Sequence, residues 1–196
     1  KGAHNAQVTV MTVGPEAHAE ALKHGLAIGC DQAVRLWDPA LEKHDSLAYA
    51  TAVAAAIRKL GDVDLVIFGK EMSDLATEQH IFQTARKLGW NLLGFVAKIE
   101  ALDFAARTIR VRRMGDHGVE IVASRLPAVI SVLKDINEPK YPSFIGIRKA
   151  AKAEIPVWGL ADLGLSAAEV APRVQVLGYR ELPKREGSAE IIEGAT

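Results

Sequence analysis

The fold is decided by residues 45–69, DSLAYATAVAAAIRKLGDVDLVIFG, which contain a complete helix followed by a complete strand. Asp45 is a helix N-cap residue, apolar side chains recur through 47–60 at helical spacing, and Gly61 provides a C-terminal stop. A short apolar run then spans 63–68, as in a strand buried on both faces. This stretch predicts one helix–strand unit of a parallel sheet.

The same alternation continues on both sides of this unit. Strands are expected at 8–13 and 33–37, with a helix between them. A further helix is indicated by an apolar stripe at Ile81, Phe82, Ala85 and Leu88. Alternating strands and helices are typical of a parallel sheet with helices on its faces. We therefore predict an α/β fold, a Rossmann-like, mostly parallel sheet with helices on both faces.

After residue 90 the pattern changes. Residues 91–125 contain strand-like runs joined by short polar turns, which predict an antiparallel hairpin extension, and 126–133 returns to a buried parallel strand. Beyond 134 the periodicity is weak, and five of the eight prolines lie between Pro139 and Pro183. We expect a nucleotide-binding-type domain at 1–152, with a partner-docking loop at 137–152, and an irregular C-terminal arm at 153–196 that lies on another subunit.

Composition excludes several classes of protein. The 196 residues contain 24 Lys+Arg and 24 Asp+Glu, so the chain has no net positive charge that would indicate binding to nucleic acid or to an anionic membrane. The single cysteine excludes an internal disulfide framework. Because there is neither a long apolar run nor a recognisable signal peptide, we expect a cytoplasmic protein without membrane insertion. A doubly wound sheet normally opens with a central strand and helix, so we also expect residues to be missing at both ends.

The familiar catalytic motifs are absent. No Gly-x-Gly-x-x-Gly opens a helix, Gly69-Lys70 lacks the remainder of a P-loop, and no two histidines share a helical face at metal-binding spacing. The sequence therefore predicts no metal site and no bond-making catalysis.

The first informative segment is 69–80, between a parallel strand and the helix that follows it. In open α/β sheets ligands bind at this position, and the first amides of the helix can hold a phosphate. Thr77 and Gln79 can add hydrogen bonds from their side chains. The alternative is an ordinary polar loop in which Asp74 or Thr77 caps the helix.

The second informative segment is 137–152. An apolar pair, Phe144-Ile145, lies beside cations at 140, 148, 149 and 152, as in a protein-docking loop. The alternative is a Phe144 buried in the core beside a solvated cationic face.

At these segments the sequence resembles the β subunit of electron transfer flavoproteins. The matching stretches follow one another in family order: Thr12-Val13-Gly14-Pro15, Gly69-Lys70 with Asp74 and Gln79, Leu126-Pro127-Ala128-Val129, Asn137-Glu138-Pro139-Lys140-Tyr141, Ile147-x-Lys149-Ala150 and Asp162-Leu163-Gly164. Residues 33–38 and 160–170 further resemble the methylotroph branch, which serves trimethylamine-type dehydrogenases.

This resemblance implies a bacterial, cytoplasmic heterodimer that carries electrons from a primary flavoprotein dehydrogenase through an FAD bound chiefly by the α subunit. The arm from Val157 onward would then lie on the α subunit. It implies an AMP site in this chain, at Val13, Gly69, Lys70, Ser73, Asp74, Thr77, Glu78 and Gln79. It also implies a docking segment for the dehydrogenase, with Phe144, Ile145, Arg148, Lys149 and Lys152.

The chain departs from the family pattern in the AMP loop. Leu75, Ala76, Glu78 and Ile81 replace Gly, Asp, Gly and Gly, and the Glu78 carboxylate would repel a phosphate. Whether AMP, a second FAD or nothing occupies this pocket therefore stays open. The alternative function is a stand-alone, homodimeric nucleotide-binding regulator of universal-stress type.

Overall fold

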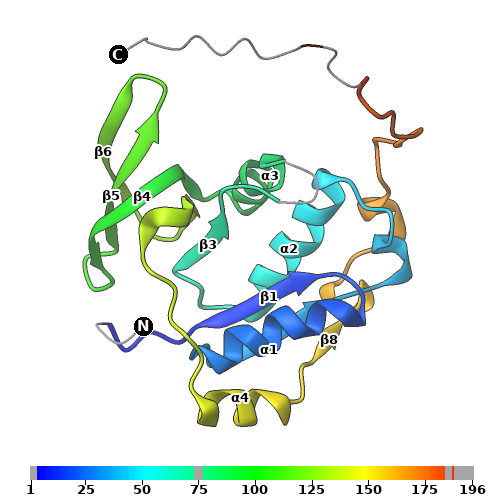
Figure 1. Ribbon diagram of the computed structural model, residues 1–196, viewed down its shortest axis with the longest axis horizontal. Helices are drawn as coiled ribbons and strands as arrows, with labels where there is room; N and C mark the ends of the chain where they lie inside the picture. Colours follow the sequence, from blue (N-terminus) through cyan, green and yellow to red (C-terminus); the bar gives the residue numbers. More distant parts are fainter. Residues whose placement is uncertain (1–3, 73–76, 184–186, 188–196) are drawn as a thin grey trace.

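The computed structural model describes residues 4–72, 77–183 and 187, and their strands form two sheets (Figure 1). The first sheet contains three parallel strands in the order β1 (Thr9–Val13), β2 (Gln32–Leu36) and β8 (Val157–Trp158). The second has the order β3 (Leu65–Gly69), β7 (Ala128–Val132), β4 (Asn91–Asp103), β5 (Thr108–Gly115) and β6 (Gly118–Arg125). All ladders are parallel except those within the β4–β5–β6 extension. The predicted α/β class, with mostly parallel strands and flanking helices, is confirmed.

The helices are α1 (Ala19–Ala27), α2 (Ser46–Leu60), α3 (Gln79–Leu88) and α4 (Phe144–Ala151). The predicted caps of α2 are confirmed, since the Asp45 carboxylate accepts from the Ala48 amide at 2.8 Å and Gly61 ends the helix at φ +85°. Asp45 caps a helix whose alanine-rich surface is almost wholly buried.

The two sheets share one apolar layer against α2. Val13 and Leu36 of the first sheet belong to the same core cluster as the buried face of α2, and Val66 and Phe68 of β3 pack against it. Within the described residues, however, no ladder joins β1 to β3. The expectation of one continuous sheet is therefore wrong for this part of the chain. Ile67 points to the opposite face from Val66 and Phe68 and is 57% exposed, so the predicted burial of 63–68 on both faces is also wrong.

Strand β4 belongs to both the parallel and the antiparallel part of its sheet. Its first residues pair parallel with β7, and its second half pairs antiparallel with β5. The change occurs at Phe95, which has φ +59° and donates its amide to the Ser131 hydroxyl at 2.9 Å. The antiparallel extension was correctly predicted, but the parallel pairing of the first half of β4 was not.

The buried face of α3 differs from the predicted stripe. Ile81 and Ala85 are buried as expected, whereas Phe82 is 40% exposed. His80 and Thr84 take its place in the core. The prediction for Phe82 is wrong because packing against β7 and α2 decides which face of α3 is buried. His80 and Thr84 lie on that face, and Phe82 does not.

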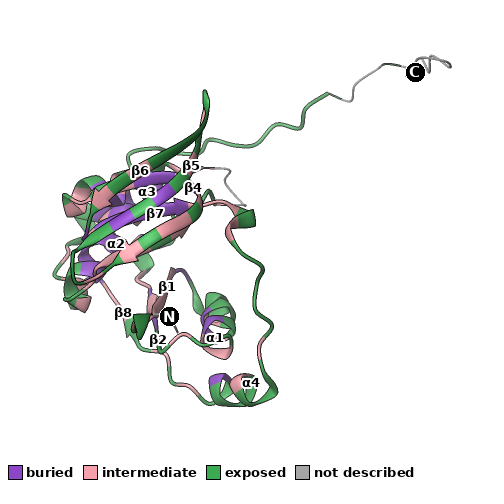
Figure 2. Cartoon of the chain, turned by 90° about the vertical axis from the view of Figure 1, so that its left-hand side faces the viewer, coloured by how far each residue is buried: buried purple, intermediate pink, exposed green. Residues whose placement is uncertain are grey.

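The predicted arm begins later than expected. Residues Val157–Trp158 pair with β2, and Leu160 and Val170 are buried in the α2 core. The first part of this stretch therefore packs within this chain, and the assignment of 153–196 to a partner subunit stays a prediction. Residues 171–183 are exposed and leave the body as extended chain (Figure 2).

Candidate functional site

The segment between β3 and α3 lies at the carboxyl end of β3, as predicted. Gly69 ends the strand and Gln79 begins the helix. The Met72 amide donates to the Thr77 carbonyl at 2.9 Å, and the Thr77 hydroxyl accepts from the Gln79 amide at 3.4 Å. Thr77 therefore engages the start of its own helix, as the polar-loop alternative predicts. Ser73 and Asp74 lie outside the described residues.

The charges of this segment do not fit a phosphate. Lys70 lies 4.0 Å from the Glu71 carboxylate, so its ammonium already has a nearby anion. Glu78 occupies the N-cap position of α3, without a capping hydrogen bond from its side chain. Among the described residues of this loop, one cation thus stands against two carboxylates, which disfavours an incoming anion. The Gln79 side-chain oxygen is also engaged, accepting from the Ser46 hydroxyl at 3.4 Å.

Val13 ends β1 in the other sheet, where its loop is held by residues that the sequence did not single out for this purpose. Its carbonyl accepts from His18 Nδ1 at 3.2 Å, so that this ring nitrogen carries the proton. The next carbonyl, of Gly14, accepts from the Arg35 guanidinium at 3.1 Å. A Cβ on Gly14 would lie 2.0 Å from His18, so the tight turn needs a glycine there. No spacing in the sequence signals the contacts of His18 and Arg35.

A buried aromatic cluster lies beneath the start of α3. The His80 ring is 4% exposed and packs edge-on against Tyr49 and Phe68, with centroid distances of 5.2 and 5.5 Å. Burial lowers the pKa of His80 and raises the pKa of Tyr49 to about 12, so both groups are neutral at pH 7. His80 Nδ1 is buried without a hydrogen-bond partner among the described residues. The floor under this segment is consequently uncharged.

The predicted docking loop contains a helix. Residues Phe144–Ala151 form α4, and the Ser143 hydroxyl accepts from the Gly146 amide at 3.0 Å as its N-cap. Gly146 and Ala150 face α1, and a Cβ on Gly146 would lie only 2.3 Å from the Ala27 carbonyl oxygen. Ser143 and the small residues at 146 and 150 favour this short helix, packed closely on α1, inside the predicted docking segment.

This packing turns the five predicted docking residues outward. Phe144 is 74% and Ile145 79% exposed, so the alternative of a core Phe144 is wrong. The Arg148 guanidinium lies over the Phe144 ring at 5.9 Å. A shallow hollow of about 390 Å³ is lined by Phe144, Ile145, Arg148, Lys149 and Lys152. We call these five residues the α4 patch. The structure brings together the whole set that the sequence proposed.

The described residues offer neither a metal centre nor a membrane-spanning helix. They contain no group of three or more His, Cys, Asp or Glu side chains that is arranged to hold a metal ion. In the same part of the chain, no helix has the length and apolar character that crossing a membrane requires.

Comparison with known proteins identifies the family. The model of the electron transfer flavoprotein domain matches residues 1–163. The chain is 37% identical over 166 residues to Protein FixA of Azorhizobium caulinodans, covering 83% of this chain and 59% of that protein. It is 37% identical over 163 residues to the electron transfer flavoprotein subunit beta of Mycobacterium bovis, with 83% and 60% covered. It is also 34% identical over 194 residues to the caffeyl-CoA reductase-Etf complex subunit CarD of Acetobacterium woodii, with 97% and 72% covered.

The chain belongs to the electron transfer flavoprotein domain family. Its recognition as a β-type member is confirmed, whereas the methylotroph branch stays a prediction, as does the cytoplasmic location. The chain spans 59% of the length of the FixA protein that it matches, so the activity and partners of the whole protein are treated below as proposals.

Proposed function

We propose that this chain is the β-type subunit of a heterodimeric electron transfer flavoprotein that receives electrons from a primary dehydrogenase. FAD, held mainly by an α-type subunit, would supply the redox chemistry when bound. The residues of this chain would dock partners and orient them, without bond-making catalysis of their own. The observation that carries the proposal is the α4 patch, an exposed aromatic and aliphatic pair surrounded by cations on a well-anchored helix.

The anchoring of α4 suits a surface that must find its partner quickly. Ser143 caps the helix, while Gly146 and Ala150 hold it close to α1. Phe144 and Ile145 are therefore presented before the partner arrives, which lowers the entropy cost of binding. A small preorganised contact of this kind fits transient electron-transfer complexes better than permanent ones.

The exposed arm at 171–183 suits the more permanent partner. Its side chains Val176, Leu177, Tyr179 and Leu182 are all at least 64% exposed. At its start, the Arg173 and Val174 amides donate to the Asp45 carboxylate at 2.6 and 3.3 Å. An exposed segment that is held at one end and carries several exposed apolar side chains has the form of a segment that packs on another subunit. We assign it to the α-type subunit.

Stopped-flow reduction of the flavin tests the docking role. The Phe144→Ala heterodimer should accept electrons from its dehydrogenase at least tenfold more slowly, because a central aromatic anchor typically carries much of the binding energy. Its FAD content should not change, since Phe144 lies on the surface of this chain. Phe82→Ala removes another partly exposed phenylalanine, on α3, and should leave the rate unchanged.

An unchanged rate in Phe144→Ala would remove the docking role. Size-exclusion chromatography of the chain, alone and with its α-type subunit, tests the assembly itself. A yellow heterodimer supports the proposal. A stable colourless homodimer that does not bind the α-type subunit supports the stand-alone regulator instead.

A further inference from the structure

The exposed arm at 171–183 is held to the body at two points that almost adjoin in the sequence. The first is apolar, because Val170 is fully buried in the core cluster around α2. The second is polar, because the Arg173 and Val174 amides donate to the Asp45 carboxylate at 2.6 and 3.3 Å. Together the two points fix the direction in which the arm leaves the body.

The two oxygens of Asp45 have separate partners. Oδ1 accepts from the Ala48 amide at 2.8 Å and caps α2. Oδ2 accepts from the Arg173 and Val174 amides. Hydrogen bonds to an ionised acceptor are roughly twice as strong as those between neutral groups. One oxygen therefore serves the helix, and the other holds the root of the arm.

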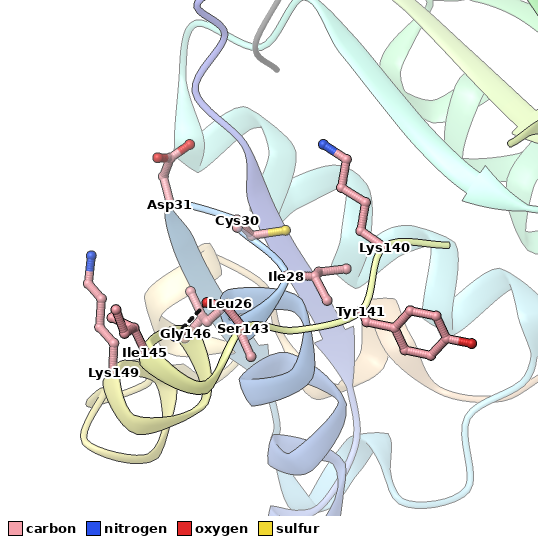
Figure 3. A pocket seen from close by; sticks show the side chains of 12 residues that line it. Leu26, Ile28, Cys30, Asp31, Lys140, Tyr141, Ser143, Ile145, Gly146 and Lys149 are labelled. Carbon is pink, nitrogen blue, oxygen red and sulfur yellow. Dashed lines mark hydrogen bonds between the residues drawn. The ribbon is translucent and has the colours of Figure 1, made fainter. Parts of the chain in front are cut away.

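Two other carboxylates of this chain also accept from backbone amides that are distant in sequence. Asp31 accepts from the Val8 amide at 2.9 Å. Figure 3 shows Asp31 near a hollow of about 440 Å³ that has Lys140 and Lys149 on opposite sides. This bond joins the entry to β1 with the entry to β2, which pair with each other.

Asp38 resembles Asp45 more closely. One of its oxygens accepts from the Ala40 amide at 3.0 Å, and the other accepts from the Leu160 amide at 3.4 Å. Leu160, however, is buried in the body. Of these three carboxylates, Asp45 is therefore the one that acts on an exposed segment.

We propose that Asp45 is a positioning residue for assembly, whose Oδ2 sets the arm in the direction in which the α-type subunit receives it. Without this bond the arm would pivot beyond Val170, and the apolar side chains between Val176 and Leu182 would occupy many directions. Ordering them on binding would then cost additional conformational entropy. This inference rests on the proposed function, and adds to it the residue that prepares the arm for its partner.

Asp45→Asn separates the two tasks of the side chain. Asparagine is as good an N-cap residue as aspartate, so its single acceptor oxygen can stay on α2. Its amino group only donates, and cannot accept from Arg173 or Val174. Asp45→Ser is a second variant, because serine also caps helices but carries no second oxygen. Asp38→Asn is the matched control, since it makes the same change at a carboxylate that does not hold the arm.

Competition for the α-type subunit measures the effect on assembly. Tagged wild-type chain and an untagged variant are mixed with a limiting amount of α-type subunit and FAD, and the two heterodimers are separated by the tag and quantified. Wild type should be preferred about tenfold over Asp45→Asn and Asp45→Ser, which corresponds to ordering roughly one additional residue. Asp38→Asn should compete as well as wild type.

Hydrogen exchange followed by NMR tests the contact itself. In the wild-type chain the Arg173 and Val174 amides should exchange at least tenfold more slowly than in Asp45→Asn. The Tm of both Asp45 variants should stay within about 4 °C of wild type, because the cap of α2 is kept. Unprotected Arg173 and Val174 amides in the wild-type chain would overturn the inference, whatever the variants do.

The competition has three other outcomes that count against the inference. Equal capture of wild type and both Asp45 variants would overturn it and leave the proposed function intact. Preferential capture of the Asp45 variants would do the same, because the bond would then hold the arm away from the partner. An equal loss in Asp38→Asn would assign the effect to the missing charge rather than to the arm. A wild-type chain that forms no heterodimer would overturn both the inference and the proposed function.

Discussion

Gly146→Ala tests the packing that orients the α4 patch. The added Cβ would lie 2.3 Å from the Ala27 carbonyl oxygen and 3.1 Å from the Ser143 hydroxyl. The first contact involves backbone at the end of α1, which cannot turn aside as a side chain can. The substitution must therefore push α4 away from α1, together with Phe144 and Ile145.

Two opposing effects set the size of the change. Alanine in a helix interior is favoured over glycine by about 1 kcal/mol. Overpacking typically costs roughly 1–3 kcal/mol, and a contact this short with backbone belongs near the upper end. We expect a net loss of about 1–2 kcal/mol in the free energy of unfolding, which for a chain of this length lowers Tm by roughly 2–8 °C.

Thermal unfolding followed by circular dichroism measures the loss, and stopped-flow reduction of the heterodimer measures its consequence for docking. Gly25→Ala is the matched control, since it makes the same glycine-to-alanine change inside α1. There the nearest atoms, at 3.0 to 3.3 Å, belong to the Val10 side chain, so the added Cβ is less crowded than at Gly146. A Gly146→Ala chain as stable as wild type, with normal electron acceptance, would refute the argument that close α1–α4 packing positions the patch.

Three other predictions concern the rest of the chain. Because the pKa of buried His80 lies below its ordinary value of 6.5, the unfolded chain takes up the proton first, and the free energy of unfolding should fall as pH drops from 7 toward about 5. His80→Phe should flatten this dependence in denaturant titrations, and an unaltered slope would show that His80 is not responsible. Asp45→Ala should lower the free energy of unfolding by about 1–2 kcal/mol through the lost cap, and it should speed proteolysis of the arm. Asp45→Asn keeps an acceptor oxygen and should lower the free energy of unfolding by less. Equal losses in the two variants would contradict the capping argument. Nucleotides released from the denatured heterodimer should include FAD but no stoichiometric AMP, because Glu71 and Glu78 oppose a phosphate, and one AMP per heterodimer would show that the loop binds it despite them.

The Asp45 carboxylate both caps α2, which follows it in the sequence, and binds the distant start of the arm. Burial raises its pKa, but donation by the Ala48, Arg173 and Val174 amides outweighs this, so the pKa of Asp45 lies below its ordinary value. Its role as the cap of α2 was readable from the sequence, because a cap and its helix are neighbours along the chain. Its hydrogen bond to the arm, more than 120 residues away, could not be read from the sequence.

The sequence by itself determined the features that depend on near neighbours. The helix at 46–60 with its caps, the strands before residue 134, and the hairpin of β5 and β6 all follow from local spacing and side-chain type. The resemblance to the electron transfer flavoprotein family likewise rested on short motifs in order along the chain, and the family model confirms it.

Only the tertiary structure decided where segments distant in sequence meet. It divided the described strands into two sheets, buried His80 in place of Phe82, and packed Val157–Trp158 onto β2. It also brought Gly146 against Ala27 and placed Lys140 and Lys149 on opposite sides of one hollow. The physical reason is that burial and pairing depend on which surfaces come together in space, and the periodicity of a single segment does not record this.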